Sequence, residues 1–369
     1  MTGVQTCALP ICTRPEAIKM CPIVLELKKR NEFKVIVCVT GQHKTMLEQV
    51  LKAFLVVPDY NLDIMKEKQT LFDVTTNVLM SIKDVLNKEK PDIVLVHGDT
   101  STSFAAALAC FYENISVGHV EAGLRTYNMQ SPFPEEFNRQ AISLVSNIDF
   151  APTTMARENL IKEGKDKDKI YVTGNTAIDA LKTTVREEYS HPVLEWACGS
   201  RIILITAHRR ENLGEPMRHM FRAIKRVLDE HDDVKAIYPI HLNPVVRDIA
   251  YEVFGDDDNI KLIEPLEVLD FHNFMKKSYM ILTDSGGIQE EAPSLGKPVL
   301  VMRDTTERPE GIDAGTLKLV GTDEEVIYEH FARLLDDKEE YEAMSNASNP
   351  YGDGHASERI CEILEKLLC

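Results

Sequence analysis

The chain has 369 residues, of which 44% are hydrophobic and 27% charged, with a net charge of −17 at pH 7. These values are typical of a soluble globular protein of about two domains. The acidic balance argues against nucleic-acid or anionic-membrane partners, because both depend on an excess of lysine and arginine. No C-x-x-C spacing occurs among the eight cysteines, and no apolar run approaches the ~20 residues that span a bilayer, so we expect a reduced, cytoplasmic protein.

Short apolar runs alternate with helical patterns along the chain. This alternation is typical of βαβ units around a parallel sheet, and runs such as Ile93–Val96 indicate strands buried on both faces. In chain order we expect helix 14–30, strand 33–39, helices 45–50 and 71–89, strand 93–96, helix 101–112, strand 115–120, helix 135–146, strand 150–151, helix 155–163, strand 170–172, helix 176–187, strand 202–206, helix 216–230, strand 236–240, helix 244–254, strand 260–263, helix 268–277, strand 280–283, helix 287–295, strand 298–301, and helices 324–336, 341–346 and 355–368.

The alternating pattern occurs twice. A polar break over residues 186–199, which contains Pro192, precedes a new strand at Ile202. We place the boundary between about Val172 and Arg201, and divide the chain into Rossmann-like domains of residues 1–172 and 173–354. The first twelve residues have no basic region or long apolar core, which argues against a signal peptide, and Pro10 makes them a poor central strand.

Three carboxylates occupy positions suited to chemistry. Asp99 and Glu121 directly follow two apolar runs, and the carboxyl ends of parallel strands open onto the ligand crevice. Acids placed there can transfer protons, although Asp99 can equally cap the helix that follows it. Glu135 begins a helix, where it can pair with Arg139 at i, i+4 or simply complement the helix dipole.

The best anion-binding motif is Ser285-Gly286-Gly287, between an apolar strand and a helix. Ser285 can cap the helix, and the glycines let a phosphate approach the helix N-terminus; the alternative is an ordinary capped turn. The chain contains neither a Walker A loop nor a G-x-G-x-x-G fingerprint.

Basic residues lie at comparable positions in both halves. Arg14 and Arg308 each precede a proline that can occupy a first helical turn, and Lys19 follows one turn after the first of these prolines. Each arginine can clamp a diphosphate or simply remain solvated. His208, beside Arg209, follows a strand and suits acid–base catalysis or phosphate contact, whereas a polar loop is the alternative.

Together these segments resemble the non-hydrolysing UDP-N-acetylglucosamine 2-epimerases of bacteria, from Thr13 to the end of the chain. The resemblance implies a GT-B fold, in which two Rossmann-like domains face each other across a cleft and the last helix, 355–369, returns to the first domain. It is carried by the segments 13–19, 40–43, 97–100, 119–126, 134–139, 173–176, 208–212, 284–291 and 303–310.

The resemblance implies interconversion of UDP-N-acetylglucosamine and UDP-N-acetylmannosamine for cell-surface polysaccharide synthesis, with no cofactor. UDP leaves by anti elimination to give 2-acetamidoglucal, and then adds back. Such a reaction needs acid–base groups on both faces of C2 and cations at the leaving diphosphate. By position, the implied catalytic residues are Asp99, Glu121, Glu135 and His208, and the implied substrate and UDP contacts are Arg14, Lys19, Arg139, Arg209, Ser285, Gly286, Gly287, Glu291 and Arg308.

The resemblance further implies a homodimer and a regulatory UDP-N-acetylglucosamine site. The matching positions for that site are Gln42, Arg209 and His241, whereas Lys68 differs from the polar residue used there and could supply the charge. On sequence alone, His241 is a ligand contact or a structural hydrogen bonder. Cys12 departs from the family, which has a glycine there after an apolar strand. Our hypothesis is that residues 1–12 replace the native first strand, and that poor pairing there displaces Arg14 and Lys19.

Three alternatives remain open. A hydrolysing 2-epimerase would release UDP and N-acetylmannosamine, a GT-B glycosyltransferase would transfer the sugar to an acceptor, and a nucleotide-sugar sensor would bind the same ligand with weak catalysis.

Overall fold

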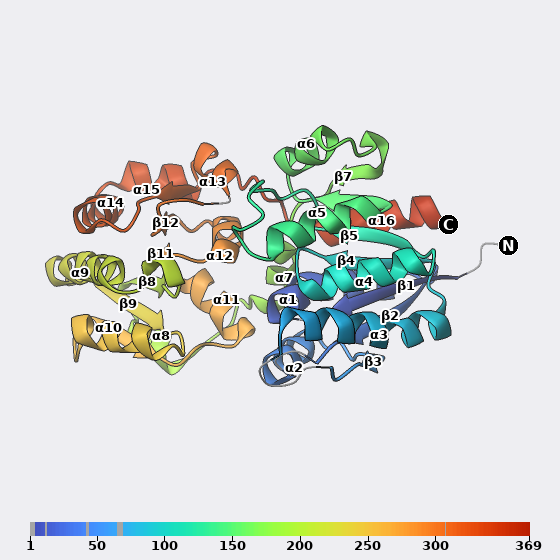
Figure 1. The fold of residues 1–369 in the computed structure, drawn as a ribbon. Coiled ribbons are helices and arrows are strands. Elements are labelled where there is room, and N and C mark those ends of the chain that lie inside the picture. Colours follow the sequence, from blue (N-terminus) through green and yellow to red (C-terminus); the bar gives the residue numbers. More distant parts are fainter. Residues whose placement is uncertain (1–3, 12, 42–43, 65–68, 307) are drawn as a thin grey trace. The chain divides into compact units, whose positions relative to one another are not determined.

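The computed structural model describes residues 4–11, 13–41, 44–64, 69–306 and 308–369 (Figure 1). The chain divides into two compact units: unit one is Met1–Thr183 with Tyr351–Cys369, and unit two is Thr184–Pro350. The division therefore falls after Thr183, within the expected range but later than residue 172. Helix α7 (Thr176–Thr184) stays with unit one because its Asp179 carboxylate accepts hydrogen bonds from the first two amides of α16 (Ala356–Leu368), at 3.2 and 2.7 Å.

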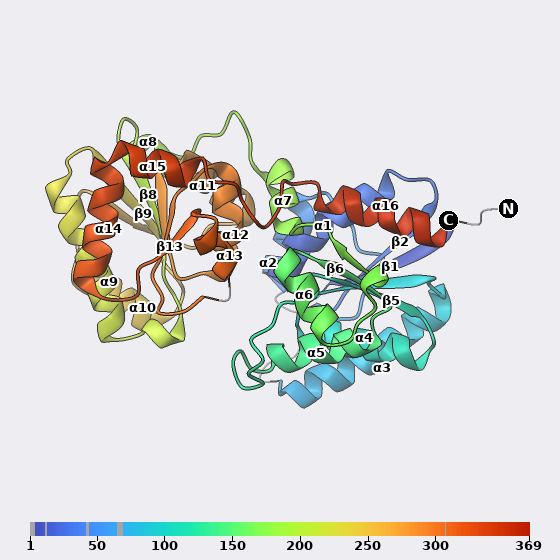
Figure 2. The ribbon, with the colours of Figure 1, turned by 90° about the horizontal axis from the view of Figure 1, so that it is seen from above.

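Unit one is built around a seven-stranded sheet with the order β3-β2-β1-β4-β5-β6-β7, in which every pairing is parallel. Helices α1 and α16 lie on one face of this sheet, and α3, α4 and α5 lie on the other (Figure 2). The strands are β1 (Gln5–Ile11), β2 (Phe33–Val39), β3 (Tyr60–Asn61), β4 (Ile93–His97), β5 (Ser116–Val120), β6 (Ile148–Ala151) and β7 (Ile170–Val172), and the other helices are α1 (Arg14–Lys28), α2 (Lys44–Ala53), α3 (Leu71–Glu89), α4 (Ser101–Tyr112), α5 (Glu135–Val145) and α6 (Thr154–Lys162).

Unit two repeats the plan with a six-stranded parallel sheet of order β10-β9-β8-β11-β12-β13. Its core packs Phe221, Tyr238 and Phe331, all fully buried, between the sheet and its helices. The strands are β8 (Arg201–Thr206), β9 (Val234–Pro239), β10 (Ile260–Ile263), β11 (Met280–Thr283), β12 (Val299–Val301) and β13 (Leu317–Leu319), and the helices are α8 (Pro192–Trp196), α9 (Glu215–Glu230), α10 (Pro244–Phe254), α11 (Val268–Lys277), α12 (Gly286–Glu291), α13 (Pro309–Asp313), α14 (Glu324–Asp336) and α15 (Lys338–Ser345).

The predicted α/β class with two parallel sheets is confirmed. In the described part of the chain, no helix combines the length and apolar character needed to cross a bilayer.

The prediction that Pro10 makes a poor central strand is wrong. β1 lies between β2 and β4, and it pairs with β2 from Gln5↔Phe33 to Ile11↔Val39. Alternate residues of a parallel strand face opposite neighbours, and the Ile11 carbonyl accepts from Thr40 on the β2 side at 3.1 Å. Pro10 therefore faces β4, and its missing N–H falls just past the end of the described β1–β4 pairing at Cys7 and Ala8.

The expected displacement of Arg14 and Lys19 is also wrong. Helix α1 begins at Arg14, and Thr13 and Glu16 form a capping box at its start. The Glu16 carboxylate is buried and accepts hydrogen bonds from Thr100 at 2.6 Å and Ser103 at 3.0 Å, which ties the start of α1 to the β4–α4 loop.

Candidate active site

Asp99 and Glu121 lie on neighbouring loops because β4 and β5 are adjacent parallel strands. Gly98, with φ +61°, turns the chain after β4, and its N–H donates to the Val120 carbonyl at 2.9 Å. The N-cap of α4 is Thr100, whose side chain accepts from the Ser103 amide, so Asp99 does not cap this helix. The carboxylate of Asp99 is thus available for another task.

Glu121 has an unusual backbone conformation, and hydrogen-bond donors surround its carboxylate. Its φ of +62° lies in the left-handed region, which is costly for a residue with a side chain. Its Oε2 atom accepts hydrogen bonds from Lys19 Nζ and from Asn175 Nδ2 at 3.0 Å, and His97 Nε2 lies 3.7 Å away. The side chain is only 10% exposed, so these donors stabilise a carboxylate that has little access to water.

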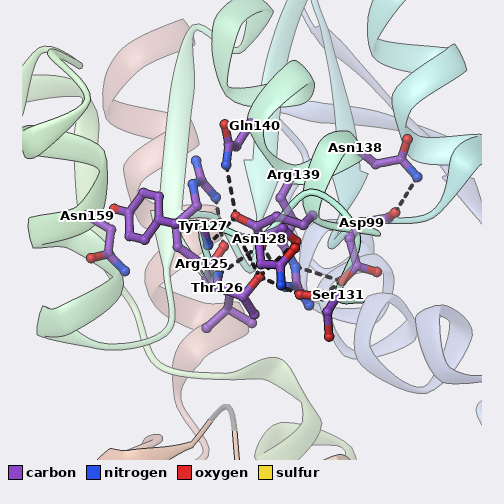
Figure 3. Close-up of polar contacts among 12 residues, drawn as sticks. Asp99, Arg125, Thr126, Tyr127, Asn128, Ser131, Asn138, Arg139, Gln140 and Asn159 are labelled. Carbon is purple, nitrogen blue, oxygen red and sulfur yellow. Dashed lines mark hydrogen bonds and ion pairs between the residues drawn. The ribbon is translucent and has the colours of Figure 1, made fainter. Parts of the chain in front are cut away.

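Asp99 pairs with Arg139 of α5. The guanidinium contacts Asp99 Oδ2 through Nε at 2.9 Å and Nη2 at 2.7 Å, and Asn138 Nδ2 donates to the Asp99 carbonyl at 2.8 Å (Figure 3). Burial raises the pKa of Asp99, although Arg139 opposes the rise. The predicted contact of Arg139 with substrate stays a prediction; in this structure Arg139 holds Asp99.

Of the two alternatives for Glu135, the pair with Arg139 is not found among the described contacts, and the neighbouring Glu136 contacts Arg139 at 3.3 Å instead. Glu136 is fully buried and accepts from the amides of Thr126 and Tyr127, each at 3.0 Å. Burial disfavours its charge, but these bonds and one from a glutamine of α5 outweigh burial and lower the pKa of Glu136. Glu136 therefore anchors a loop, whereas Glu135 is partly exposed and close enough for its charge to contribute to the raised pKa of Asp99.

In unit two, Asp284 positions His208. Asp284 follows β11, is fully buried, and accepts through Oδ2 from the backbone amides of His208 and Arg209, both at 2.8 Å. The His208 ring stacks on His241 with centroids 5.4 Å apart. Burial lowers the pKa of His208 against the attraction of Asp284, so the imidazole is neutral at neutral pH and can exchange a single proton.

The Ser285–Gly287 motif begins α12, but the Ser285 side chain does not cap it, contrary to prediction. The Ser285 amide instead donates to the Thr283 hydroxyl at 2.9 Å. A Cβ added to Gly286 would lie 2.6 Å from Arg308 Nη1, so a glycine here lets the guanidinium lie against the first helical turn. Arg308 also contacts Glu290 at 2.7 Å, and this arginine beside backbone amides suits an anionic group.

The remaining predicted residues fall into two groups. Glu291 is 9% exposed, with its carboxylate 3.6 Å from His272 Nε2, whereas Gln42 and Lys68 lie outside the described residues. Among the residues described, no cluster of histidine, cysteine, aspartate or glutamate could hold a metal ion.

Three contributors were not predicted as site residues: His97, Asn175 and Asp284. Each ends or closely follows a strand, so the strand-end rule that identified Asp99 and Glu121 could have found them.

The fold and these groups define a class of α/β proteins with two Rossmann-like units, one bearing strand-end carboxylates and the other a glycine–arginine anion motif. The profile of the UDP-N-acetylglucosamine 2-epimerase family matches residues 25–365. The chain belongs to the UDP-N-acetylglucosamine 2-epimerase family.

Relatives and solved structures of this family match almost the whole chain. A UDP-N-acetylglucosamine 2-epimerase of Bacillus subtilis is 64% identical over 95% of this chain and 93% of its own length. The crystal structure of a putative enzyme of that name from Listeria monocytogenes has a TM-score of 0.94 at 54% identity, covering 99% of this chain and 97% of its own. The Neisseria meningitidis enzyme, solved bound to UDP-GlcNAc, has a TM-score of 0.90 at 50% identity, covering 98% and 100%.

Proposed function

We propose that this chain interconverts UDP-N-acetylglucosamine and UDP-N-acetylmannosamine without net hydrolysis. The observation that carries the proposal is the pair of carboxylates on adjacent strand-end loops, Asp99 with Arg139 and Glu121 with Lys19. Two acid–base groups side by side suit a reaction that removes a proton from one face of C2 and returns one to the other.

The proposed steps balance without an oxidant. Removal of the C2 proton and cleavage of the C1–O bond to the diphosphate form the C1=C2 bond of 2-acetamidoglucal and release UDP within the enzyme. Return of the UDP oxygen to C1 and of a proton to the opposite face of C2 completes the epimerisation. C2–H is a poor acid, so stabilisation of the departing diphosphate by cations must assist the base.

We assign roles from the surroundings of each group. Glu121, which accepts from Lys19 and Asn175, stays ionised and acts as base, whereas burial makes Asp99 the better carrier of a proton. Glu135 is the third carboxylate of this proton transfer. For unit two we propose that His208, Arg209 and Arg308 contact the diphosphate with Ser285, Gly286 and Gly287, and that Glu291 binds the ribose; in unit one, Arg14 is a further nucleotide contact.

Further proposals follow from the family. The Neisseria meningitidis relative bound to UDP-GlcNAc supports the same ligand for this chain. We also propose a regulatory UDP-N-acetylglucosamine site that includes Gln42, Lys68, Arg209 and His241, a homodimer, and supply of cell-surface polysaccharide synthesis.

NMR of UDP-N-acetylglucosamine incubated with the protein in D₂O tests the proposal. We expect UDP-N-acetylmannosamine carrying deuterium at C2. Free N-acetylmannosamine formed together with UDP would indicate the hydrolysing enzyme, and an unchanged substrate would indicate a transferase or sensor. Glu121→Gln should abolish deuterium uptake and retain UDP binding; uptake that persists would contradict the role of Glu121.

A further inference from the structure

Two buried histidines at the ends of β4 and β5 have no role in the proposed proton transfer. His97 is the last residue of β4 and is 5% exposed, and His119 of β5 is fully buried. The register pairs His97 with Val120 and Val96 with His119, so the two histidines sit diagonally on adjacent strands. Burying an imidazole is costly unless its nitrogens have hydrogen-bond partners, so the groups that each ring faces matter.

His119 fixes the loop that follows the neighbouring strand β4. Its Nε2 lies 2.7 Å from the Gly98 carbonyl, and a carbonyl can only accept, so Nε2 carries the proton. The Gly98 N–H in turn donates to Val120 at 2.9 Å. Both backbone groups of Gly98, the residue before Asp99, are therefore bonded to β5.

His97 faces the loop that follows β5. Its Nε2 is buried without a hydrogen bond in the described structure, and lies 3.7 Å from Glu121 Oε2. The same oxygen accepts from Lys19 and Asn175. An approach of about 0.6 Å would convert the His97 contact into a charge-assisted hydrogen bond.

We propose that His97 and His119 are crossed positioning residues, in which each ring holds the site loop of the neighbouring strand: His97 holds the carboxylate of Glu121, and His119 holds the backbone that carries Asp99. The inference rests on the proposed function, since it serves the two carboxylates assigned to proton transfer at C2.

Electrostatics are consistent with two neutral donors. Burial lowers the pKa of His97 to about 4 against the attraction of Glu121, with Lys19 and His119 as the other charged or titratable neighbours. Burial likewise lowers the pKa of His119 to about 4, where Asp149 is the neighbouring acid and Arg125 and Lys165 are the neighbouring bases. A neutral donor orients a carboxylate without adding a positive charge that would weaken Glu121 as a base.

The test compares His97→Leu, which removes the donor, with His97→Gln, which restores an N–H near the position of Nε2. The readout is deuterium uptake at C2 between about pH 5 and 9. For His97→Leu we expect kcat to fall about 10- to 100-fold, the loss expected if His97 closes on Glu121 during the reaction and forms a hydrogen bond to its charge, with KM within about threefold. The acid limb of the kcat profile should move to higher pH, because the variant loses a donor that favours the charged form of the carboxylate. His97→Gln should restore both.

The His119 variants provide the contrast. His119→Leu should lower kcat while leaving the acid limb in place, because His119 contacts Gly98 and not Glu121. His219→Gln on α9, with a side chain 44% exposed, is the control and should change nothing. The proposal would be overturned if His97→Leu kept the kcat and the acid limb of the wild type. It would also be overturned if His97→Leu and His97→Gln lost kcat equally while the acid limb stayed in place, because a loss of packing alone would explain that result.

If the leucine variants do not fold, imidazole ¹⁵N NMR of the wild-type protein tests the proposal. His97 should be a neutral Nε2–H tautomer whose signal shifts in Glu121→Gln, and an Nδ1–H tautomer would overturn the proposal. Failure of the proposed function is read separately from the wild-type products: if these are UDP and free sugar, deuterium at C2 of the released sugar still measures the step that His97 assists.

Discussion

Replacing Asp284 by alanine should destabilise unit two and misplace His208. The Oδ2 atom of Asp284 accepts from the amides of His208 and Arg209, both at 2.8 Å, and from Asn212 Nδ2 at 3.3 Å. Because the carboxylate is fully buried, water cannot take its place without a local rearrangement. The loop after β8 would then lose the acceptor that fixes its course.

The magnitude follows from the two backbone amides. Each loses a charged acceptor, and because their surroundings are only partly buried, we take about 1–2 kcal/mol for each, or about 2–4 kcal/mol in total. Asp284→Asn keeps an oxygen in the same place but removes its charge, so about half of this loss is expected. The same order, wild type above Asn above Ala, should appear in kcat, since His208 is the group that moves.

Trp196, the only tryptophan of the chain, reports the unfolding of unit two in urea. It lies in α8 beneath the ammonium groups of Lys235, 4.6 Å from the ring, and Lys261, 4.7 Å away, so its fluorescence depends on local packing. Asp232→Asn, at an exposed position of the same unit, is the matched control. Unfolding of Asp284→Ala within about 0.5 kcal/mol of the wild type would refute this reasoning.

Three further predictions concern unit one. His97 and His119 have pKa values lowered from 6.5 to about 4, so below pH 6.5 the unfolded chain binds protons that the folded chain does not. The free energy of unfolding should therefore be highest above pH 6.5 and should fall by about 3 kcal/mol per histidine as the pH drops to 4. Urea unfolding followed by circular dichroism measures this fall, and His119→Gln should lessen it. A Cβ on Gly123, with φ +89°, would lie 2.2 Å from the Ala156 carbonyl oxygen, so Gly123→Ala should lower the free energy of unfolding by about 3 kcal/mol or more. The control is Gly164→Ala, where φ is +85° but the space is open, and it should cost about 1 kcal/mol. Equal shifts of the melting temperature in the two variants would contradict the clash. Pro10→Val should change the free energy of unfolding by less than about 1 kcal/mol, because the proline lies past the end of the β1–β4 pairing, and a larger gain in calorimetry would show that residues 1–12 impair the first strand.

Long amphipathic helices could be predicted from sequence, and short or unusual elements could not. The expected bounds of α3, α4, α10, α11 and α14 match the structure. A side-chain cap begins each of these helices except α11. β3, β13, α8 and α13 were not expected because two to five residues carry no usable periodicity. The prediction for β1 is wrong for another reason. The effect of a proline in a strand depends on which neighbouring strand its missing N–H faces, and only the strand register shows this.

The residues of the candidate site likewise fall into those that the sequence predicts and those that it does not. Placement at strand ends singled out Asp99, Glu121 and His208, since that rule depends only on element order. Their partners could not be predicted, because Lys19 and Glu121 are 102 positions apart and Asn175 and Glu121 are 54 apart. The possible Glu135–Arg139 pair does not form because helix spacing ignores Asp99 and the buried Glu136, which compete for the same guanidinium.

The backbone of Glu121 bears on why a carboxylate stands there. At φ +62° a glycine would avoid a strain of about 1–3 kcal/mol, so the local conformation alone favours glycine at this position. The glutamate side chain must offset that strain, and burial of its charge, through its contacts with Lys19 and Asn175. Those contacts fix the carboxylate at the end of β5, beside the Asp99 loop, so the energy that stabilises the strained turn is also the energy that preorganises the proposed base.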